Sequence, residues 1–88
     1  MYCRLVVYKT KKGVRKIAQR AAHESLSELK QKEGFRTATF LVNSKENEYI
    51  ASYFWDTYKQ AHDQVDYLFK ELEDFPSATI YEVFEQER

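Results

Sequence analysis

The sequence predicts an α+β fold in which two helices pack on one face of a four-stranded antiparallel sheet. Three observations predict it. Four short runs are rich in β-branched and aromatic residues, and two amphipathic helical patterns separate them in the order strand, helix, strand, strand, helix, strand. The chain has 88 residues, which is the size of one domain, spanning 1–88. Its two glycines and one proline each lie at a boundary between predicted elements.

The first strand is predicted over Tyr2–Lys9, where aromatic and β-branched residues gather before Gly13 interrupts the pattern. A helix is predicted next, because apolar residues recur every three or four positions and form one continuous stripe. Gly34 provides a left-handed stop for this helix. The stripe consists of Val14, Ile17, Ala18, Ala21, Ala22, Ser25, Leu26 and Leu29.

The second and third strands are predicted over Phe35–Asn43 and Tyr49–Trp55, joined by a polar hairpin loop. Thr57 and Gln60 then have the spacing of a capping box, which predicts the start of a second helix. Pro76 ends that helix, and Ala78–Phe84 forms the fourth strand. The stripe of the second helix consists of Tyr58, Ala61, His62, Val65, Leu68, Phe69 and Leu72.

This order matches the ferredoxin-like βαββαβ sandwich, in which strands one and three are central and both helices cover the same face. The predicted strands are apolar on both faces, so large side chains remain on the uncovered face; we expect Phe40, Val42, Tyr81 and Val83 among them. A second copy of the chain is the expected cover. The sequence therefore predicts a homodimer.

Composition limits the possible functions. One cysteine, no apolar leader and no long apolar run favour a soluble, cytoplasmic protein with no membrane partner. The formal net charge is zero, although residues 1–36 hold ten Lys or Arg against three acids, so we expect no nucleic-acid partner. The third predicted strand also lacks the basic-Gly-aromatic signature of an RNA-recognition module. The basic start of the first helix is interpreted as a solvated face, with anion binding as the alternative.

His62 is the candidate catalytic residue. It lies on the predicted inner stripe of the second helix, where a general base or a ligand hydrogen-bond partner would face a cavity. The alternative is a partly buried histidine bonded to the backbone or to a tyrosine. His23 lies off the stripe of the first helix and is expected to be solvated. No metal-ligand spacing occurs, so we expect no metal site.

Aromatic side chains are numerous for so short a chain, with seven Tyr, six Phe and one Trp. They suit a pocket for a flat ligand, in which phenol groups fix its orientation. The alternative is ordinary packing in the core and at an interface. The candidate pocket residues are Tyr8, Tyr53, Trp55, Tyr58 and His62.

The chain resembles the dimeric α+β barrel superfamily, and in particular its antibiotic-biosynthesis-monooxygenase-like domains. The resemblance rests on an opening strand that runs into Lys12-Gly13, on Glu33-Gly34-Phe35 at the start of strand two, and on Trp55 just before the second helix. It implies a homodimer whose two sheets close into a barrel, with a pocket between each sheet and its helices. Members include cofactor-independent oxygenases of aromatic or quinol compounds, so no cofactor is expected.

The pattern of the haem-degrading members is not present. Those enzymes use an Asn in strand one, whereas alignment on Gly13 places Val6 at that position in this chain. They also use a Trp and a His far along helix two, whereas here Trp55 ends strand three and His62 comes early in the helix. Two hypotheses therefore stand: a monooxygenase-like enzyme acting on an aromatic or quinol-like small molecule, and a non-catalytic ligand-binding, structural or regulatory dimer.

Overall fold

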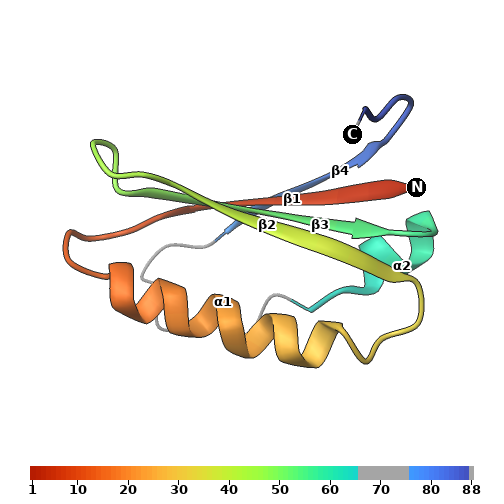
Figure 1. Ribbon diagram of the computed structural model, residues 1–88. Coiled ribbons are helices and arrows are strands. Elements are labelled where there is room, and N and C mark those ends of the chain that lie inside the picture. Colours follow the sequence, from red (N-terminus) through yellow and green to blue (C-terminus); the bar gives the residue numbers. More distant parts are fainter. Residues whose placement is uncertain (66–75, 88) are drawn as a thin grey trace.

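The structure, a computed structural model, describes residues 1–65 and 76–87 (Figure 1). Within these residues the chain forms four strands and two helices in the predicted order. The sheet is antiparallel with strand order β2-β3-β1-β4, so strands one and three are central, as predicted. The elements are β1 (Tyr2–Lys9), α1 (Arg15–Leu29), β2 (Phe35–Asn43), β3 (Glu48–Trp55), α2 (Tyr58–Asp63) and β4 (Ser77–Glu82).

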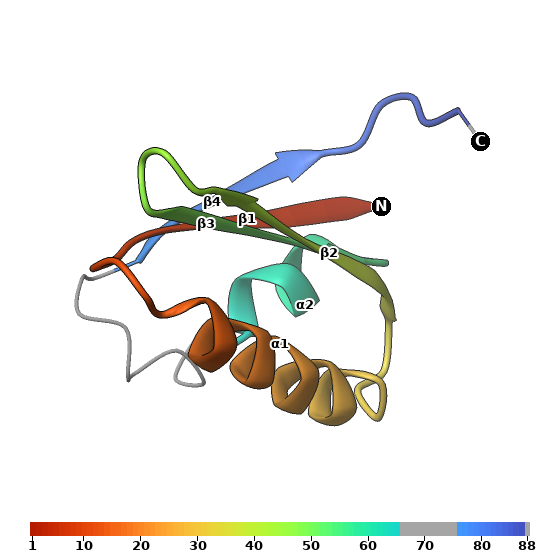
Figure 2. The ribbon, with the colours of Figure 1, turned by 60° about the vertical axis from the view of Figure 1, so that its left-hand side comes forward.

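The molecule has two layers. Figures 1 and 2 show both helices on the same side of the sheet, while the C-terminal segment after β4 rises away on the other side. The two faces of the sheet therefore have different surroundings, because only one of them packs against helices. We call the face away from the helices the open face.

The core forms between the helices and the two central strands. Val6 of β1 lies opposite Ala51 of β3, and Tyr53 and Trp55 follow on the same face of β3 because alternate residues of a strand point the same way. These side chains are at most 3% exposed. Leu29 of α1 joins the same cluster from the helical layer.

The second strand changes its facing near its start. The pairing with β3 is irregular between Phe35 and Thr37, which inserts one extra residue, Arg36. One extra residue reverses which side chains face the core. Phe40 therefore lies opposite the core residue Ala51, and the prediction that Phe40 and Val42 occupy the open face is wrong.

The open face is apolar over both central strands. Cys3 of β1 lies opposite Phe54 of β3 and Tyr81 of β4, which places the three on one surface. Tyr81 is 52% exposed, as predicted for the open face, and Leu41 of β2 is 53% exposed. The remaining residues of this face are Leu5, Val7, Thr37, Thr39, Ile50, Ser52, Ser77 and Thr79, with the polar residues Lys9, Asn43 and Glu48 at one end.

The helix α1 packs on the sheet through small side chains. Ala18, Ser25 and Leu29 are buried, whereas Ile17 of the predicted stripe is 43% exposed. The buried Ser25 hydroxyl donates to the Ala22 carbonyl at 2.9 Å, so it needs no partner outside the helix. The helix is followed by Gly34 with φ +84°, the left-handed conformation predicted there.

The helix α2 begins as predicted and ends earlier than predicted. The capping box is present: Thr57 Oγ1 accepts from the Gln60 amide at 3.2 Å, and Gln60 Oε1 accepts from the Thr57 amide at 3.1 Å. Gln64 is extended, with ψ 136°, so the helical pattern does not continue to Val65, which is 59% exposed. The indole N–H of Trp55 donates to Gln64 Oε1 at 2.9 Å and holds the chain there. Leu68, Phe69 and Leu72 lie outside the described residues.

The fourth strand ends at Glu82, two residues before the predicted end. One further backbone bond follows the strand, from the Val83 amide to the Met1 carbonyl at 3.0 Å. Phe84 follows and is 92% exposed. A large apolar side chain therefore projects from the C-terminal segment.

Candidate functional site

A cavity of about 270 Å³ lies between α1 and the sheet. Its floor comes from β1, β2 and β3, and its wall comes from the first three turns of α1. The gap exists because the residues of α1 that face the sheet here are small. The cavity is lined by Tyr8, Arg15, Ala18, Gln19, Ala22, His23, Leu26, Phe40, Val42, Tyr49 and Ala51. Leu41 and Ile50 also border it, although the register places their side chains on the open face.

The sheet side of the cavity is aromatic. Tyr8 and Tyr49 are paired across β1 and β3, and Tyr8 is only 1% exposed, with its hydroxyl oxygen buried. Phe40 lies beside them and contacts Tyr53 edge-on, with ring centroids 5.8 Å apart. Aromatic rings in fixed positions provide the flat apolar surface against which a planar ligand stacks.

The helix side of the cavity has an apolar stripe and a polar stripe. Ala18 and Ala22 are four residues apart and stand one above the other on the face toward the sheet. Arg15, Gln19 and His23 are also spaced by four, so they form a parallel row at the mouth, where all three are exposed. The site thus combines an apolar floor with a guanidinium, a carboxamide and an imidazole along one edge.

The sequence-predicted pocket residues do not come together around this cavity. Tyr8 lines it, whereas Tyr53 is buried in the core beside Phe40, outside the set of lining residues. Trp55 lines a second hollow of about 330 Å³ between the C-terminal end of α1 and α2. That hollow is bordered mostly by charged and amide side chains, namely those of Glu28, Lys32, Glu33, Lys59, Gln60, Asp63 and Gln64.

The remaining two predicted residues, Tyr58 and His62, lie on the outer surface. The prediction that His62 lies on an inner stripe is wrong, since its side chain is 65% exposed. Its ring stacks on Tyr58 at 5.9 Å, and Tyr58 in turn contacts Tyr2 edge-on. The reason is the orientation of α2: Ala61 is the residue buried against the sheet, so the neighbouring position points outward.

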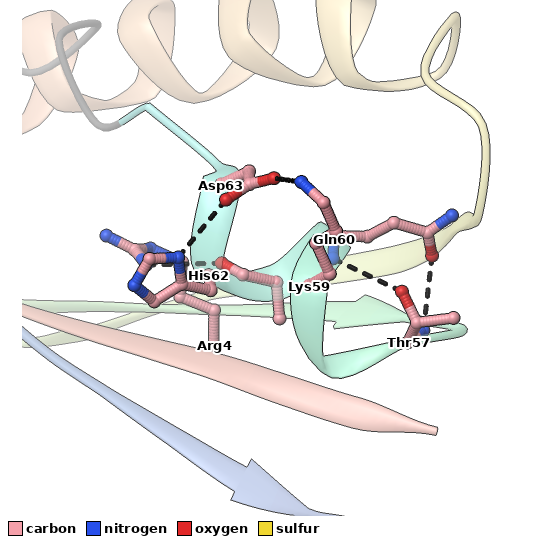
Figure 3. Close-up of polar contacts among 7 residues, drawn as sticks. Arg4, Thr57, Lys59, Gln60, His62 and Asp63 are labelled. Carbon is pink, nitrogen blue, oxygen red and sulfur yellow. Dashed lines mark hydrogen bonds and ion pairs between the residues drawn. The ribbon is translucent and has the colours of Figure 1, made fainter.

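A polar network surrounds His62 (Figure 3). His62 Nδ1 lies 3.1 Å from Asp63 Oδ1, and Lys59 pairs with the other oxygen of the same carboxylate. The hydrogen bond from Lys59 lowers the pKa of Asp63, and the bond from His62 lowers it further by a smaller amount. In return, the Asp63 carboxylate raises the pKa of Lys59. Below the helix, Arg4 donates to the Ala61 carbonyl at 3.2 Å. The network stabilises one exposed helix end and does not reach the cavity lining.

Sequence reasoning missed the polar row of α1. His23 is exposed, as expected, but it also borders the cavity, together with Arg15 and Gln19. The signal was present in the sequence, because the three residues share a spacing of four and flank the stripe that contains Ala18 and Ala22. It was not decisive, because the same spacing also describes an ordinary solvated helix face.

Two further features concern residues 1–65 and 76–87, the part of the chain that the structure describes. In this part of the chain, no group of three or more His, Cys, Asp or Glu side chains is arranged to hold a metal ion. No helix formed by the described residues has the length and apolar character needed to cross a membrane.

Comparisons with known proteins agree with the architecture. No protein-family model matches the sequence, and no curated protein matches it. Solved structures do match over nearly the full length, and several of them are named as antibiotic biosynthesis monooxygenases. The chain has the fold of these monooxygenases. The predicted resemblance is therefore confirmed at the level of the fold, with its βαββαβ order and antiparallel sheet.

Three of the matches show the range of this fold. NE2512 from Nitrosomonas europaea, a protein of unknown function, has a TM-score of 0.76 at 14% identity, covering 99% of this chain and 92% of that one. SnoaB from Streptomyces nogalater, a cofactor-independent oxygenase, has a TM-score of 0.72 at 15% identity, covering 97% and 95%. The ActVA-Orf6 monooxygenase of Streptomyces coelicolor, in complex with nanaomycin D, has a TM-score of 0.73 at 15% identity, covering 99% and 90%.

Proposed function

We propose that the protein binds a flat aromatic or quinol-like small molecule in the cavity beneath α1 and oxygenates it without a cofactor. The aromatic floor of the cavity, formed by Tyr8, Phe40 and Tyr49, is the observation that carries the proposal. The volume of about 270 Å³ is just below the usual range of about 300–1,000 Å³ for small-molecule sites. A ligand of one or two rings is therefore the best fit.

The reaction would be the oxidation of a phenol by O₂ to a quinone and water. A base removes the phenol proton, and the electron-rich ring carbon then forms a bond to O₂. Loss of the proton on that carbon breaks the O–O bond, so one oxygen atom stays as the new carbonyl and the other leaves as water. His23 is the base we propose in place of His62, because it borders the cavity and an imidazole nitrogen can accept the phenol proton.

The proposed function includes a homodimer closed through the open face. Tyr81 and Leu41 are about half exposed there, and Cys3, Leu5, Val7 and Phe54 extend the apolar surface across the central strands. Full burial of a large apolar side chain is worth about 1.5–3 kcal/mol, so covering the exposed part of several of them contributes several kcal/mol. That gain is comparable to the whole stability expected of a small domain, roughly 5–15 kcal/mol.

Binding and oxygenation are tested separately. The protein is titrated with naphthols and reduced naphthoquinones while ligand affinity is followed by tyrosine and tryptophan fluorescence, and O₂ uptake is measured with an electrode. We expect saturable binding, and O₂ uptake that the His23→Gln variant loses while it still binds. His62→Gln is the matched control and should keep both. Binding without O₂ uptake would identify a non-catalytic ligand-binding protein, and no binding at millimolar ligand would refute the proposal.

The dimer is tested by light scattering at micromolar concentration. We expect about twice the protomer mass of 10.6 kDa for the natural protein, and a shift toward the protomer for Tyr81→Lys. Ile17→Lys replaces a similarly exposed apolar residue on α1 and should leave the mass unchanged. A natural protein that stays at the protomer mass, or an equal effect of both variants, contradicts the assigned interface.

A further inference from the structure

We infer that the ligand of the α1 cavity is an anion, namely a hydroxylated one- or two-ring aromatic carboxylate whose carboxylate is bound by Arg15. This inference rests on the proposed function and specifies its substrate class. It follows from the placement of polar groups around the cavity, because the apolar floor accepts any flat ring and only the polar edge can select among rings.

The polar edge lies on one side of the cavity. The floor residues Tyr8, Tyr49 and Ala51 come from the sheet, and the polar side chains at the mouth come from α1. Residues four apart on a helix are about 6 Å apart along its axis, so Arg15 and His23 are about 12 Å apart, with Gln19 midway. A ring that lies on the floor therefore presents one edge to this row, and groups at opposite ends of that edge meet different side chains.

The charges at this edge have one sign. Among the described residues that line the cavity, Arg15 carries a full positive charge and none is Asp or Glu. Lys16 follows Arg15 in the first turn of α1, which contains no acidic residue. Arg20 lies one turn further along the same helix. An approaching anion is attracted by this cluster, whereas a neutral ligand gains nothing from it.

The geometry of the guanidinium favours a carboxylate. Arginine presents parallel N–H groups that match the two oxygens of a carboxylate, and such charge-assisted bonds are about twice as strong as neutral ones. A carboxylate attached to an aromatic ring lies near the plane of the ring, so the ring remains on the floor while the carboxylate reaches Arg15 at the mouth. The phenol oxygen of the same ligand is then directed along the row toward Gln19 and His23.

The test compares two ligands that differ by one carboxylate group. The dissociation constants of 6-hydroxy-2-naphthoic acid, whose hydroxyl and carboxylate lie at opposite ends of the ring system, and of 2-naphthol are measured by titration calorimetry at low salt with the natural protein, Arg15→Gln and Arg20→Gln. We expect the natural protein to bind the acid about tenfold or more tightly than the naphthol, as a charge-assisted bond implies. Arg15→Gln should reduce this preference to within about twofold, and Arg20→Gln, which removes a charge of the same helix outside the cavity lining, should largely keep it.

The outcomes separate this inference from the proposed function. If naphthol binds and the acid binds no more tightly, or if both variants lose the preference equally, the assignment of Arg15 is overturned while the aromatic cavity stands. If neither ligand binds, both fail. Arg15 is exposed, so folding is expected to survive the substitution. Should Arg15→Gln not fold, Arg15→Met, which keeps the aliphatic part of the side chain, takes its place. Raising the salt concentration on the natural protein tests separately that charge carries the preference, because the preference for the acid must then fall with ionic strength while naphthol binding does not.

Discussion

The substitution Gly34→Ala tests how the end of α1 and the start of α2 are joined. Gly34 has φ +84°, and a Cβ built on it would overlap the carboxamide of Gln60. That carboxamide is half of the capping box, since it accepts the Thr57 amide. The carbonyl of Gly34 also accepts the Asp56 amide at 2.9 Å, so the backbone has little freedom to move away. A methyl group at residue 34 must therefore displace the Gln60 side chain.

Two costs add at this position. A left-handed conformation costs a non-glycine residue about 1–2 kcal/mol, and the smaller entropy of the unfolded alanine chain returns about 0.4–1 kcal/mol, for a net cost of roughly 1 kcal/mol. Loss of the bond between Gln60 and Thr57 adds about 1 kcal/mol. We expect Gly34→Ala to lower the free energy of unfolding by about 2 kcal/mol. In a domain of this size that lowers the melting temperature by roughly 8–16 °C.

Gly13 is the matched control, because it also has positive φ, at +81°, and a Cβ there would meet nothing within 4 Å. Gly13→Ala should therefore cost only the conformational part, about 1 kcal/mol. Unfolding by urea measures both variants at one fixed protein concentration, because the apparent stability of an associating chain depends on that concentration. In a Gln60→Ala background, Gly34→Ala should become as mild as Gly13→Ala. An equal cost of Gly34→Ala in both backgrounds would show that the overlap with Gln60 does not act as reasoned.

Two further predictions concern the sheet. Phe40→Ala should lower the free energy of unfolding in urea by about 2–3 kcal/mol, because Phe40 packs on Tyr53 in the core. Leu41→Ala, on the open face, should lower it by less than half as much. Equal costs would contradict the reversed facing of β2. Burial raises the pKa of the Cys3 thiol, with a smaller opposing effect of the Tyr53 backbone, so the stability this thiol contributes is complete below the unfolded pKa of about 8.5 and is lost as the pH rises through the folded pKa. Between about pH 7.5 and 10, the free energy of unfolding should therefore fall more steeply with pH for the natural protein than for Cys3→Ala. Parallel curves would show that the Cys3 thiol does not contribute.

The element order could be predicted because it depends on local patterns. Alternating β-branched and aromatic residues identified Tyr2–Lys9 and Phe35–Asn43 with the bounds that the structure has. The capping box of Thr57 and Gln60 and the left-handed Gly34 are also local, since each involves backbone groups within a few residues. The handedness of the crossovers then placed strands one and three at the centre of the sheet.

The candidate site could be predicted only in part. Tyr8 was identified from its strand and does line the cavity. Tyr53 is buried in the core and Trp55 lines the second hollow, because the place where α1 crosses the strands decides which residues of the sheet border the cavity. The prediction for His62 was wrong because the direction of its side chain depends on how the six-residue helix α2 is rotated about its axis. Ala61 fixes that rotation by packing against the sheet.

Taken alone, the order of residues determined which segments form strands and helices, which strands are central, and that the sheet has apolar side chains on both faces. Those properties follow from short-range periodicity and backbone preferences. Only the tertiary structure decided the facing of β2, where one extra residue reverses Phe40, and the meeting of Arg15, Gln19 and His23 with the aromatic floor. Such decisions depend on register and on packing between segments distant in the chain, and no local pattern specifies them.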